Sequence, residues 1–134
     1  MSRVDAYLER IGYSGSREAT AETLARLHRS HMLAVPFENL DIALGRRIVP
    51  SLEAFFDKIV RQRRGGFCYE LNGLFAWLLE ELGFAVTMLS ARVWDGERPG
   101  PEFDHMTLRV EIERHAFIRQ FDMMCFEVSL QTAA

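Results

Sequence analysis

The spacing of apolar residues predicts helices over the first two-thirds of the chain. Residues 4–11 are amphipathic, and a second helix can be N-capped by Thr20 and is ended by Pro36. A stronger helix follows Ser51, where apolar residues recur at i, i+3, i+4, i+7 and i+8 and form one core-facing stripe. The Gly65–Gly66 pair is expected to terminate this helix.

A further helix is predicted from Cys68 to Leu82. After Gly83 the apolar residues no longer recur at helical spacing but at every second position, which is typical of strands. Strands are predicted over residues 84–94 and 106–112, and residues 116–122 and 124–130 are expected to form one or two more. Because the helices come first and the strands follow, the pattern favours an α+β fold over an alternating parallel-sheet fold. The boundary between the two parts is expected near Gly83.

Composition and charge narrow the class of protein. The 134 residues are 49% hydrophobic and 26% charged, with a net charge of −3, which is typical of a globular domain. Slight acidity argues against binding to a nucleic-acid backbone. The longest apolar stretch, Leu74–Leu79, is far shorter than the roughly 20 residues of a membrane span, and the N-terminus does not resemble a signal peptide. We therefore expect a cytoplasmic protein that binds neither nucleic acid nor a membrane.

The cysteines give the first candidate chemistry. Cys68 and Cys125 are too few for a disulfide scaffold or a cysteine metal site, so free thiols and no metal are expected. Cys68 begins a long apolar helix, where the positive end of the helix dipole and the nearby Arg63 and Arg64 favour a thiolate. Such a cysteine is a candidate nucleophile that needs a histidine to take its proton. The alternative is a small buried residue that packs behind a helix cap.

Among the histidines, His105 is the best candidate base, because it begins a strand directly after a loop, on the polar face of that strand. His28 and His31 have a spacing that can chelate a metal, but no neighbouring carboxylate or cysteine completes a site. They are expected at the surface or the edge of the core, and His115 is expected in a solvated turn. Asp122 ends a strand among apolar residues; it is either an exposed turn residue or a buried partner of a histidine.

The run RGGFCYELNG at residues 64–73 resembles the active-site segment of the arylamine N-acetyltransferases. The stretch VPFENL at residues 35–40 is similar to the family's Pro-Phe-Glu-Asn stretch, and Leu82-Gly83-Phe84 is similar to its exit from the helical domain. His105 begins a strand where the family places its catalytic histidine. The resemblance covers most of the chain, from about residue 7 to residue 110.

The resemblance implies a helical bundle domain at residues 1–83, which carries the active-site cysteine, and a partial antiparallel β-barrel domain at residues 84–134. This is the fold of a truncated arylamine N-acetyltransferase, which is cysteine-proteinase-like. The family continues into the rest of the barrel and an α/β lid, whereas this chain ends at Ala134. An unclosed sheet has an open edge, through which a homo-oligomer could form.

Position by position, the resemblance makes Cys68 the nucleophile, His105 its base and Asp122 the residue that orients the base. It makes Glu38 and Arg64 a pair that supports the active site. The residues that it places around the acceptor amine are Phe37, Phe67 and Val93. The family follows its aspartate with Val-Gly-Phe-Gly, whereas Met-Met-Cys-Phe follows here.

The implied reaction is a ping-pong acetyl transfer that uses acetyl-coenzyme A as a substrate and needs no tightly bound cofactor or metal. The acceptor would be an aromatic amine, a hydrazine or an N-hydroxyarylamine. Two alternatives stay open. One is a catalytically inactive, truncated homologue that serves as an oligomerisation or interaction module. The other is a transglutaminase-like or papain-like hydrolase, although the RGGFCYE run and the upstream PFEN fit the acetyltransferases better.

Overall fold

The computed structural model describes residues 1–112 in full and the backbone of residues 115–119 and 126–132. The helical elements are α1 (Arg3–Arg10), α2 (Ala21–Ala34), α3 (Leu40–Ala43), α4 (Leu52–Phe56), the π-helical η1 (Asp57–Arg61) and α5 (Cys68–Glu81). The strands are β1 (Ala85–Val93), β2 (His105–Ile112), β3 (His115–Arg119) and β4 (Phe126–Thr132). The predicted α+β order is confirmed. Within this described part of the chain, no helix combines the length and the apolar character that crossing a membrane requires.

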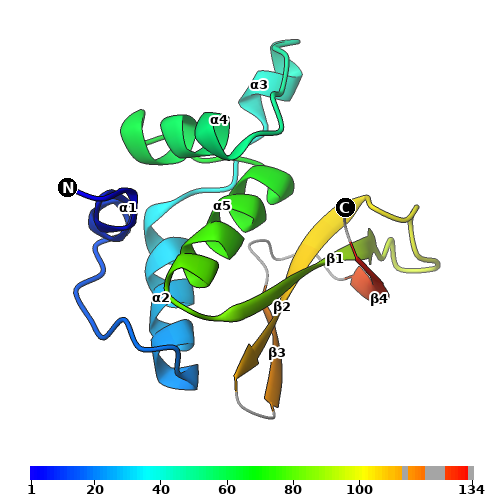
Figure 1. The fold of residues 1–134 in the computed structure, drawn as a ribbon. Coiled ribbons are helices and arrows are strands. Elements are labelled where there is room, and N and C mark those ends of the chain that lie inside the picture. Colours follow the sequence, from blue (N-terminus) through cyan, green and yellow to red (C-terminus); the bar gives the residue numbers. More distant parts are fainter. Residues whose placement is uncertain (113–114, 120–125, 133–134) are drawn as a thin grey trace.

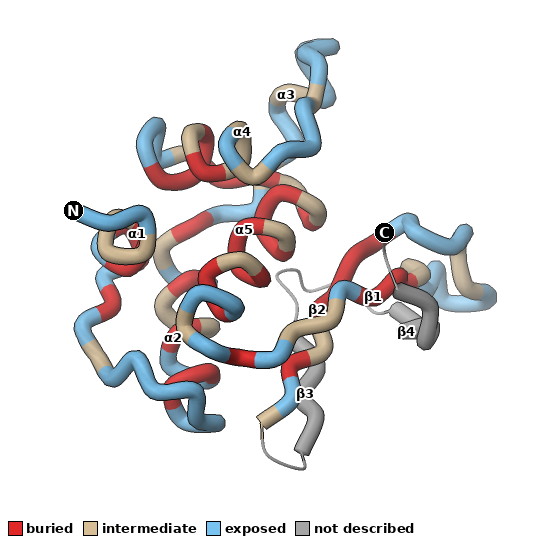
Figure 2. The backbone as a smooth tube through the Cα atoms, viewed as in Figure 1, coloured by how far each residue is buried: buried red, intermediate tan, exposed pale blue. Residues whose placement is uncertain are grey.

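Helix α5 lies between the other helices and the sheet (Figure 1). It contacts α1 and α4 as well as β1 and β2, and its apolar side chains are buried as predicted. The buried residues that it contributes to the core are Leu71, Leu74, Phe75, Ala76, Leu78 and Leu79. Figure 2 shows buried residues along α5 and along the helices that face it. A helix that is apolar on most of its circumference must be packed against other elements on several sides to keep its side chains out of water.

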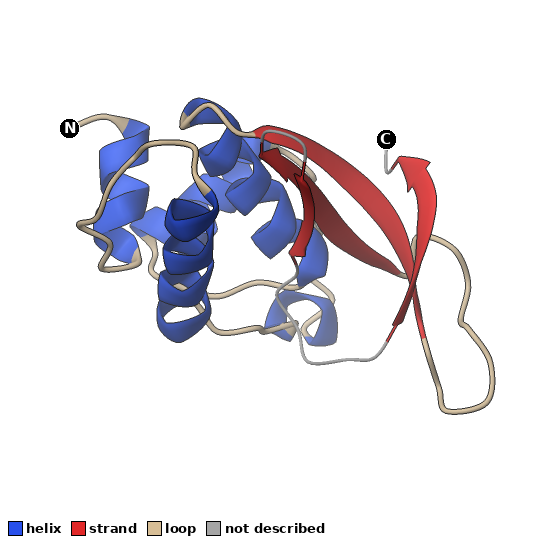
Figure 3. Cartoon of the chain, turned by 90° about the horizontal axis from the view of Figure 1, so that it is seen from below, coloured by secondary structure: helices blue, strands red, loops and turns tan. Residues whose placement is uncertain are grey.

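The sheet is antiparallel, in the order β3-β2-β1-β4, and the described strands do not close into a barrel. Figure 3 shows the sheet on one side of the helices, with the loop between β1 and β2 extending away from the body. A partial antiparallel sheet is therefore confirmed. Strands β3 and β4 are its edges, while formation of a homo-oligomer through an edge stays a prediction.

One core joins the helices to the sheet. Leu108 and Val110 of β2 are fully buried in the same cluster as the α5 side chains. The change from helix to strand occurs between Glu81 and Ala85, close to the predicted position. The division into two domains at residues 83 and 84 stays a prediction.

The helix predicted after Ser51 differs from expectation in its second half. Ser51 caps it as expected, but α4 continues into π-helical η1, which ends at Arg61. The following turn uses Arg63, with φ of 54°, and not the Gly65–Gly66 pair. The guanidinium of Arg10 stabilises this turn, since its Nη2 donates to the Arg63 carbonyl at 3.2 Å and to the Arg64 carbonyl at 3.3 Å. The expectation that the glycines end the helix was therefore wrong.

Two histidines do not lie where the sequence pattern placed them. His31 is fully buried, and its Nδ1 lies 2.6 Å from the hydroxyl oxygen of Tyr7, because α2 packs this residue inward. Its expected place at the surface or the core edge was wrong. His115 is the first residue of β3 and pairs with Ile112, so it does not lie in the expected turn.

Burial lowers the pKa of His31 to about 3, and the neighbouring His28 and Arg10 contribute in the same direction. The ordinary histidine value is 6.5, so between pH 6.5 and pH 3 the unfolded chain binds a proton that the folded chain does not. The stability associated with a neutral His31 is therefore present above pH 6.5 and is lost as the pH falls toward 3.

We expect the free energy of unfolding of the wild-type chain to fall by about 2 kcal/mol between pH 7 and pH 5 because of His31. The variant His31→Gln should be less stable at pH 7 but should lose most of this pH dependence. Urea unfolding at the two pH values measures both quantities. His28→Gln, in the same helix, is the control and should keep the dependence. A full fall in His31→Gln would contradict the assignment.

Candidate active site

The two sequence segments that carry the family resemblance lie side by side. The Gly66 N–H donates to the Pro36 carbonyl at 3.3 Å, and the Glu38 N–H donates to the Gly66 carbonyl at 2.9 Å. A Cβ at Gly65 would lie 1.9 Å from the Pro36 carbonyl oxygen, so only glycine permits this approach. The pairing fixes the chain that leads directly into Cys68.

Cys68 is the first residue of α5, as predicted, and only 7% of it is exposed. Its thiol is therefore at the positive end of the helix dipole, an environment that favours a thiolate. The helix start is also held by Glu70, whose Oε1 accepts the Phe67 N–H at 3.2 Å. The geometry suits a nucleophile, and the role of Cys68 stays a prediction.

His105 begins β2 opposite Ala91 of β1 and is 3% exposed. The strand position agrees with the prediction, but the expected polar face is buried at this end of β2, at His105 and Thr107, and becomes exposed only at Glu111. The amide of Asn72 connects the two candidate residues through the backbone. Its Nδ2 donates to the carbonyls of Cys68 and of Met106, each at 3.0 Å. The first turn of α5 and the start of β2 are thus hydrogen-bonded to each other.

The third member of the predicted triad, Asp122, lies outside the described residues, as does Cys125. The proposed orientation of His105 by Asp122 stays a prediction.

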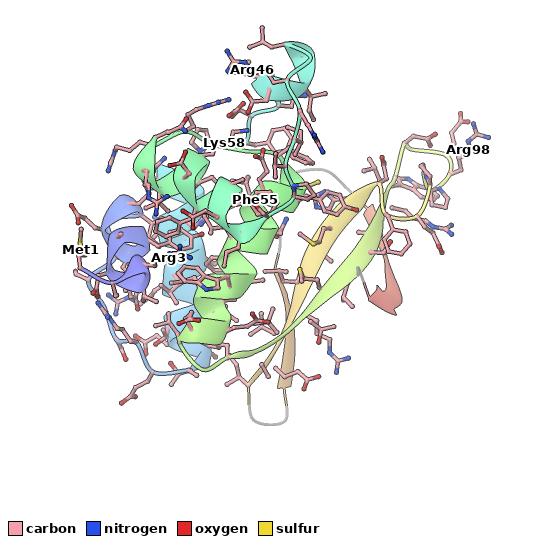
Figure 4. All side chains as sticks on the ribbon, turned by 45° about the horizontal axis from the view of Figure 1, so that its top comes forward. Met1, Arg3, Arg46, Phe55, Lys58 and Arg98 are labelled. Atoms are coloured by element: carbon pink, nitrogen blue, oxygen red, sulfur yellow. The ribbon has the colours of Figure 1, made fainter. Side chains whose placement is uncertain are left out.

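The predicted supporting pair is part of a cluster of five charged side chains. Arg64 Nη2 lies 2.9 Å from Glu38 Oε1 and 2.9 Å from Asp41 Oδ1. Lys58 Nζ lies 2.9 Å from Asp41 Oδ2, 2.9 Å from Glu70 Oε1 and 3.4 Å from Glu38 Oε1. Lys58, labelled in Figure 4, belongs to η1. The cluster therefore joins η1, the start of α5 and residues 38–41.

The ion pairs shift the pKa values of four members of this cluster toward their charged forms: Glu38, Asp41, Lys58 and Arg64. Hydrogen bonds from Lys58 and then Arg64 lower the pKa of Asp41 to about 2. Burial acts to lower the pKa of Lys58, but the hydrogen bonds to Glu70 and Asp41 outweigh it, so the pKa is raised. Burial likewise opposes, without reversing, the lowering of the Glu38 pKa by the Leu40 N–H and the two cations.

Sequence reasoning missed three members of this cluster. Glu70 occupies the third position of α5, where an acidic residue is a known capping signal, so it could have been found. Asp41 and Lys58 gave no comparable signal, because their partners lie in other elements.

An apolar cavity of about 340 Å³ lies beside the start of α5. Its lining residues are Ile48, Pro50, Leu52, Phe55, Phe67, Tyr69, Gly73, Met88 and Met106. Of the residues predicted around the acceptor, Phe67 lines this cavity, whereas Phe37 is half exposed and Val93 is at the end of β1. Phe55, also labelled in Figure 4, enters from α4.

No group of three His, Cys, Asp or Glu side chains that could hold a metal ion occurs among the residues that the structure describes. The pair His28 and His31 therefore gains no third ligand within that part of the chain.

Comparison with known proteins gives a consistent match. The family model described as N-acetyltransferase matches residues 20–121. The chain is 42% identical over 118 residues to the pineal gland isozyme of arylamine N-acetyltransferase from Gallus gallus, covering 86% of this chain and 41% of the relative. It is also 42% identical over 113 residues to arylamine N-acetyltransferase of Escherichia coli (strain K12), covering 84% of this chain and 40% of that protein. The chain thus spans about two-fifths of the length of these curated relatives.

Solved structures of arylamine N-acetyltransferases also match the fold of this chain. Arylamine N-acetyltransferase from Salmonella typhimurium superposes with a TM-score of 0.85 at 37% identity, covering 90% of this chain and 44% of that one. The Mycobacterium marinum enzyme in complex with CoA superposes with a TM-score of 0.80 at 37% identity, covering 88% of this chain and 45% of that one. The motifs, the fold and the family match agree, and the chain belongs to the arylamine N-acetyltransferase family, of which it corresponds to an N-terminal part.

Proposed function

We propose that the chain carries the catalytic core of an arylamine N-acetyltransferase. Acetyl would pass from acetyl-coenzyme A, through a thioester on Cys68, to an aromatic amine, a hydrazine or an N-hydroxyarylamine. The observation that carries this proposal is the buried Cys68 at the N-terminus of α5, connected through Asn72 to the strand that His105 begins. The CoA complex of the Mycobacterium marinum relative supports the choice of donor.

In the first half-reaction, the Cys68 sulfur attacks the thioester carbonyl carbon while His105 takes the thiol proton. A carbon–sulfur bond forms to Cys68, the bond to the coenzyme A sulfur breaks, and the leaving thiolate receives the proton from His105. The acetyl group is then held on the enzyme as a thioester, and free coenzyme A is the first product.

In the second half-reaction, the acceptor nitrogen attacks the acetyl carbon and His105 takes a proton from that nitrogen. The bond to the Cys68 sulfur breaks, and the sulfur regains a proton, so the enzyme returns to its initial state. Asp122 would orient the imidazole in both steps. The net change is one amide bond formed for one thioester cleaved, without an oxidant or a metal.

The surroundings of Cys68 support the roles proposed for the acceptor-site residues and for the Glu38–Arg64 pair. The apolar cavity beside Phe67 has room for an aromatic ring, in keeping with an aryl acceptor, and Phe37 and Val93 would complete the acceptor site. The pairing of Glu38 with Arg64 would brace the chain before Cys68. A cytoplasmic, reducing setting would keep the Cys68 thiol free for the reaction.

We expect incubation with acetyl-coenzyme A or p-nitrophenyl acetate to add one acetyl group to the chain, located on Cys68. The expectation follows from the position of this thiol at a helix N-terminus. Intact-mass spectrometry followed by peptide mapping measures the adduct. Cys68→Ala should remain unmodified, whereas Cys125→Ala, which removes the other thiol, should still be acetylated.

Absence of an adduct on the wild-type chain, or an equal adduct on Cys68→Ala, would exclude Cys68 as the acetyl carrier. A catalytically inactive homologue would show no adduct with either acetyl-coenzyme A or p-nitrophenyl acetate.

We expect His105→Ala to slow acetylation of Cys68 by roughly 10²- to 10⁴-fold at neutral pH, which is the usual contribution of a general base. The rate of p-nitrophenol release in a stopped-flow assay measures the effect. His115→Ala is the matched control, because this histidine begins the neighbouring strand β3 and has no proposed role. If His105→Ala reacted within about twofold of wild type, His105 would not be the base.

A further inference from the structure

Two side chains of the first turns of α5 reach the chain on either side of His105. The Tyr69 hydroxyl donates to the Phe103 carbonyl at 2.6 Å, and Asn72 Nδ2 donates to the Met106 carbonyl at 3.0 Å. The carbonyls belong to the residue two positions before His105 and to the residue directly after it. The helix that presents the thiol therefore holds the segment that presents the imidazole at two points.

The Asn72 amide connects the two candidate residues most directly. Its Nδ2 donates both to the Met106 carbonyl and to the Cys68 carbonyl, so one amide bridges the two backbones. Asn72 is fully buried, and within the described part of the chain its Oδ1 has no hydrogen-bond partner. The two donated bonds determine the orientation of this amide, because the reverse orientation would place Oδ1 against two carbonyl oxygens, to which it cannot donate.

The second point of attachment is on strained backbone. Phe103 has φ of 60°, a left-handed conformation that is unfavourable for a bulky side chain. Its N–H donates to Ser90 Oγ at 2.8 Å, while its carbonyl accepts from Tyr69. The peptide groups of this residue are thus held from β1 on one side and from α5 on the other, and this holds the strained turn in place directly before β2.

Tyr69 remains a hydrogen-bond donor throughout the neutral pH range. Burial raises the pKa of its hydroxyl, and negative charge at Cys68 and at Asp104 acts in the same direction.

We propose that Tyr69 and Asn72 are positioning residues that hold the 103–106 segment, and with it His105, in place against Cys68. The inference rests on the proposed function, because Tyr69 and Asn72 can have a positioning role only if His105 assists Cys68. A purely structural role would lower stability alone. A positioning role also lowers the reactivity of Cys68, and it does so only while His105 is present.

The test compares Tyr69→Phe and Asn72→Ala with their parent, in chains with and without His105→Ala. All chains also carry Cys125→Ala, so that alkylation by iodoacetamide reports on Cys68 alone. With His105 present, we expect each substitution to slow alkylation at pH 7 by about ten- to a hundredfold, because small displacements of reacting groups have effects of this size. The pH midpoint of alkylation should rise as well. In the His105→Ala chains, the same substitutions should change the rate by less than about twofold.

Tyr13→Phe is the matched control for Tyr69→Phe. The Tyr13 hydroxyl also donates to a backbone carbonyl, that of Ser16, at 2.6 Å, but it lies in the loop before α2. Its loss should leave the alkylation rate of Cys68 unchanged. If Asn72→Ala fails to fold, Tyr69→Phe, which removes only one hydroxyl, decides the question.

Three other outcomes would overturn the inference, and they differ in whether the proposed function also fails. Alkylation within about twofold of the parent in Tyr69→Phe and Asn72→Ala, with a clear effect of His105→Ala, leaves the proposed function standing and rejects the positioning role. An equal slowing with and without His105 shows a purely structural role. If His105→Ala itself has no effect, the proposed function fails, and the positioning role fails with it.

Discussion

The burial of α5 between the helices and the sheet is the constraint on which the rest of the structure depends. This helix carries apolar side chains toward α1, α4, β1 and β2, so both layers of the fold pack against it. Burying it also takes its polar first turns out of water. Cys68, Glu70 and Asn72 are each less than a tenth exposed, and buried polar groups of this kind require partners. The hydrogen bonds around the candidate site follow from this requirement.

Glu70 shows how one buried charge organises its neighbours. A carboxylate that is 4% exposed is stable only when it is paired, and Lys58 from η1 supplies the opposite charge. Lys58 is also shared with Asp41 and Glu38, and Arg64 completes the set. The carboxylate buried at the start of α5 is thereby linked through Lys58 to Glu38 and Asp41. The apolar core and the charge cluster thus act together to position the chain around Cys68.

Elements with a long, regular pattern could be predicted from the sequence, and so could residues at their ends. Thr20 and Ser51 cap the predicted helices, Cys68 begins the predicted α5, and His105 begins the predicted β2. Asn72 and Tyr69 could not be recognised, because their partners are 34 residues away in the chain. His31 looked like a residue of the core edge for the same reason, since its place in the core depends on Tyr7 of another helix.

The sequence by itself determined the order of helices and strands, the position of a cysteine at a helix N-terminus and the membership of the family. These features are local, because they depend on side-chain periods and motifs within about ten residues. Only the tertiary structure decided that the polar face of β2 is buried at His105, that Lys58 is shared by three carboxylates and that Asn72 joins Cys68 to Met106. The physical reason is that burial and hydrogen bonding depend on which elements pack together, and a local pattern does not specify those partners.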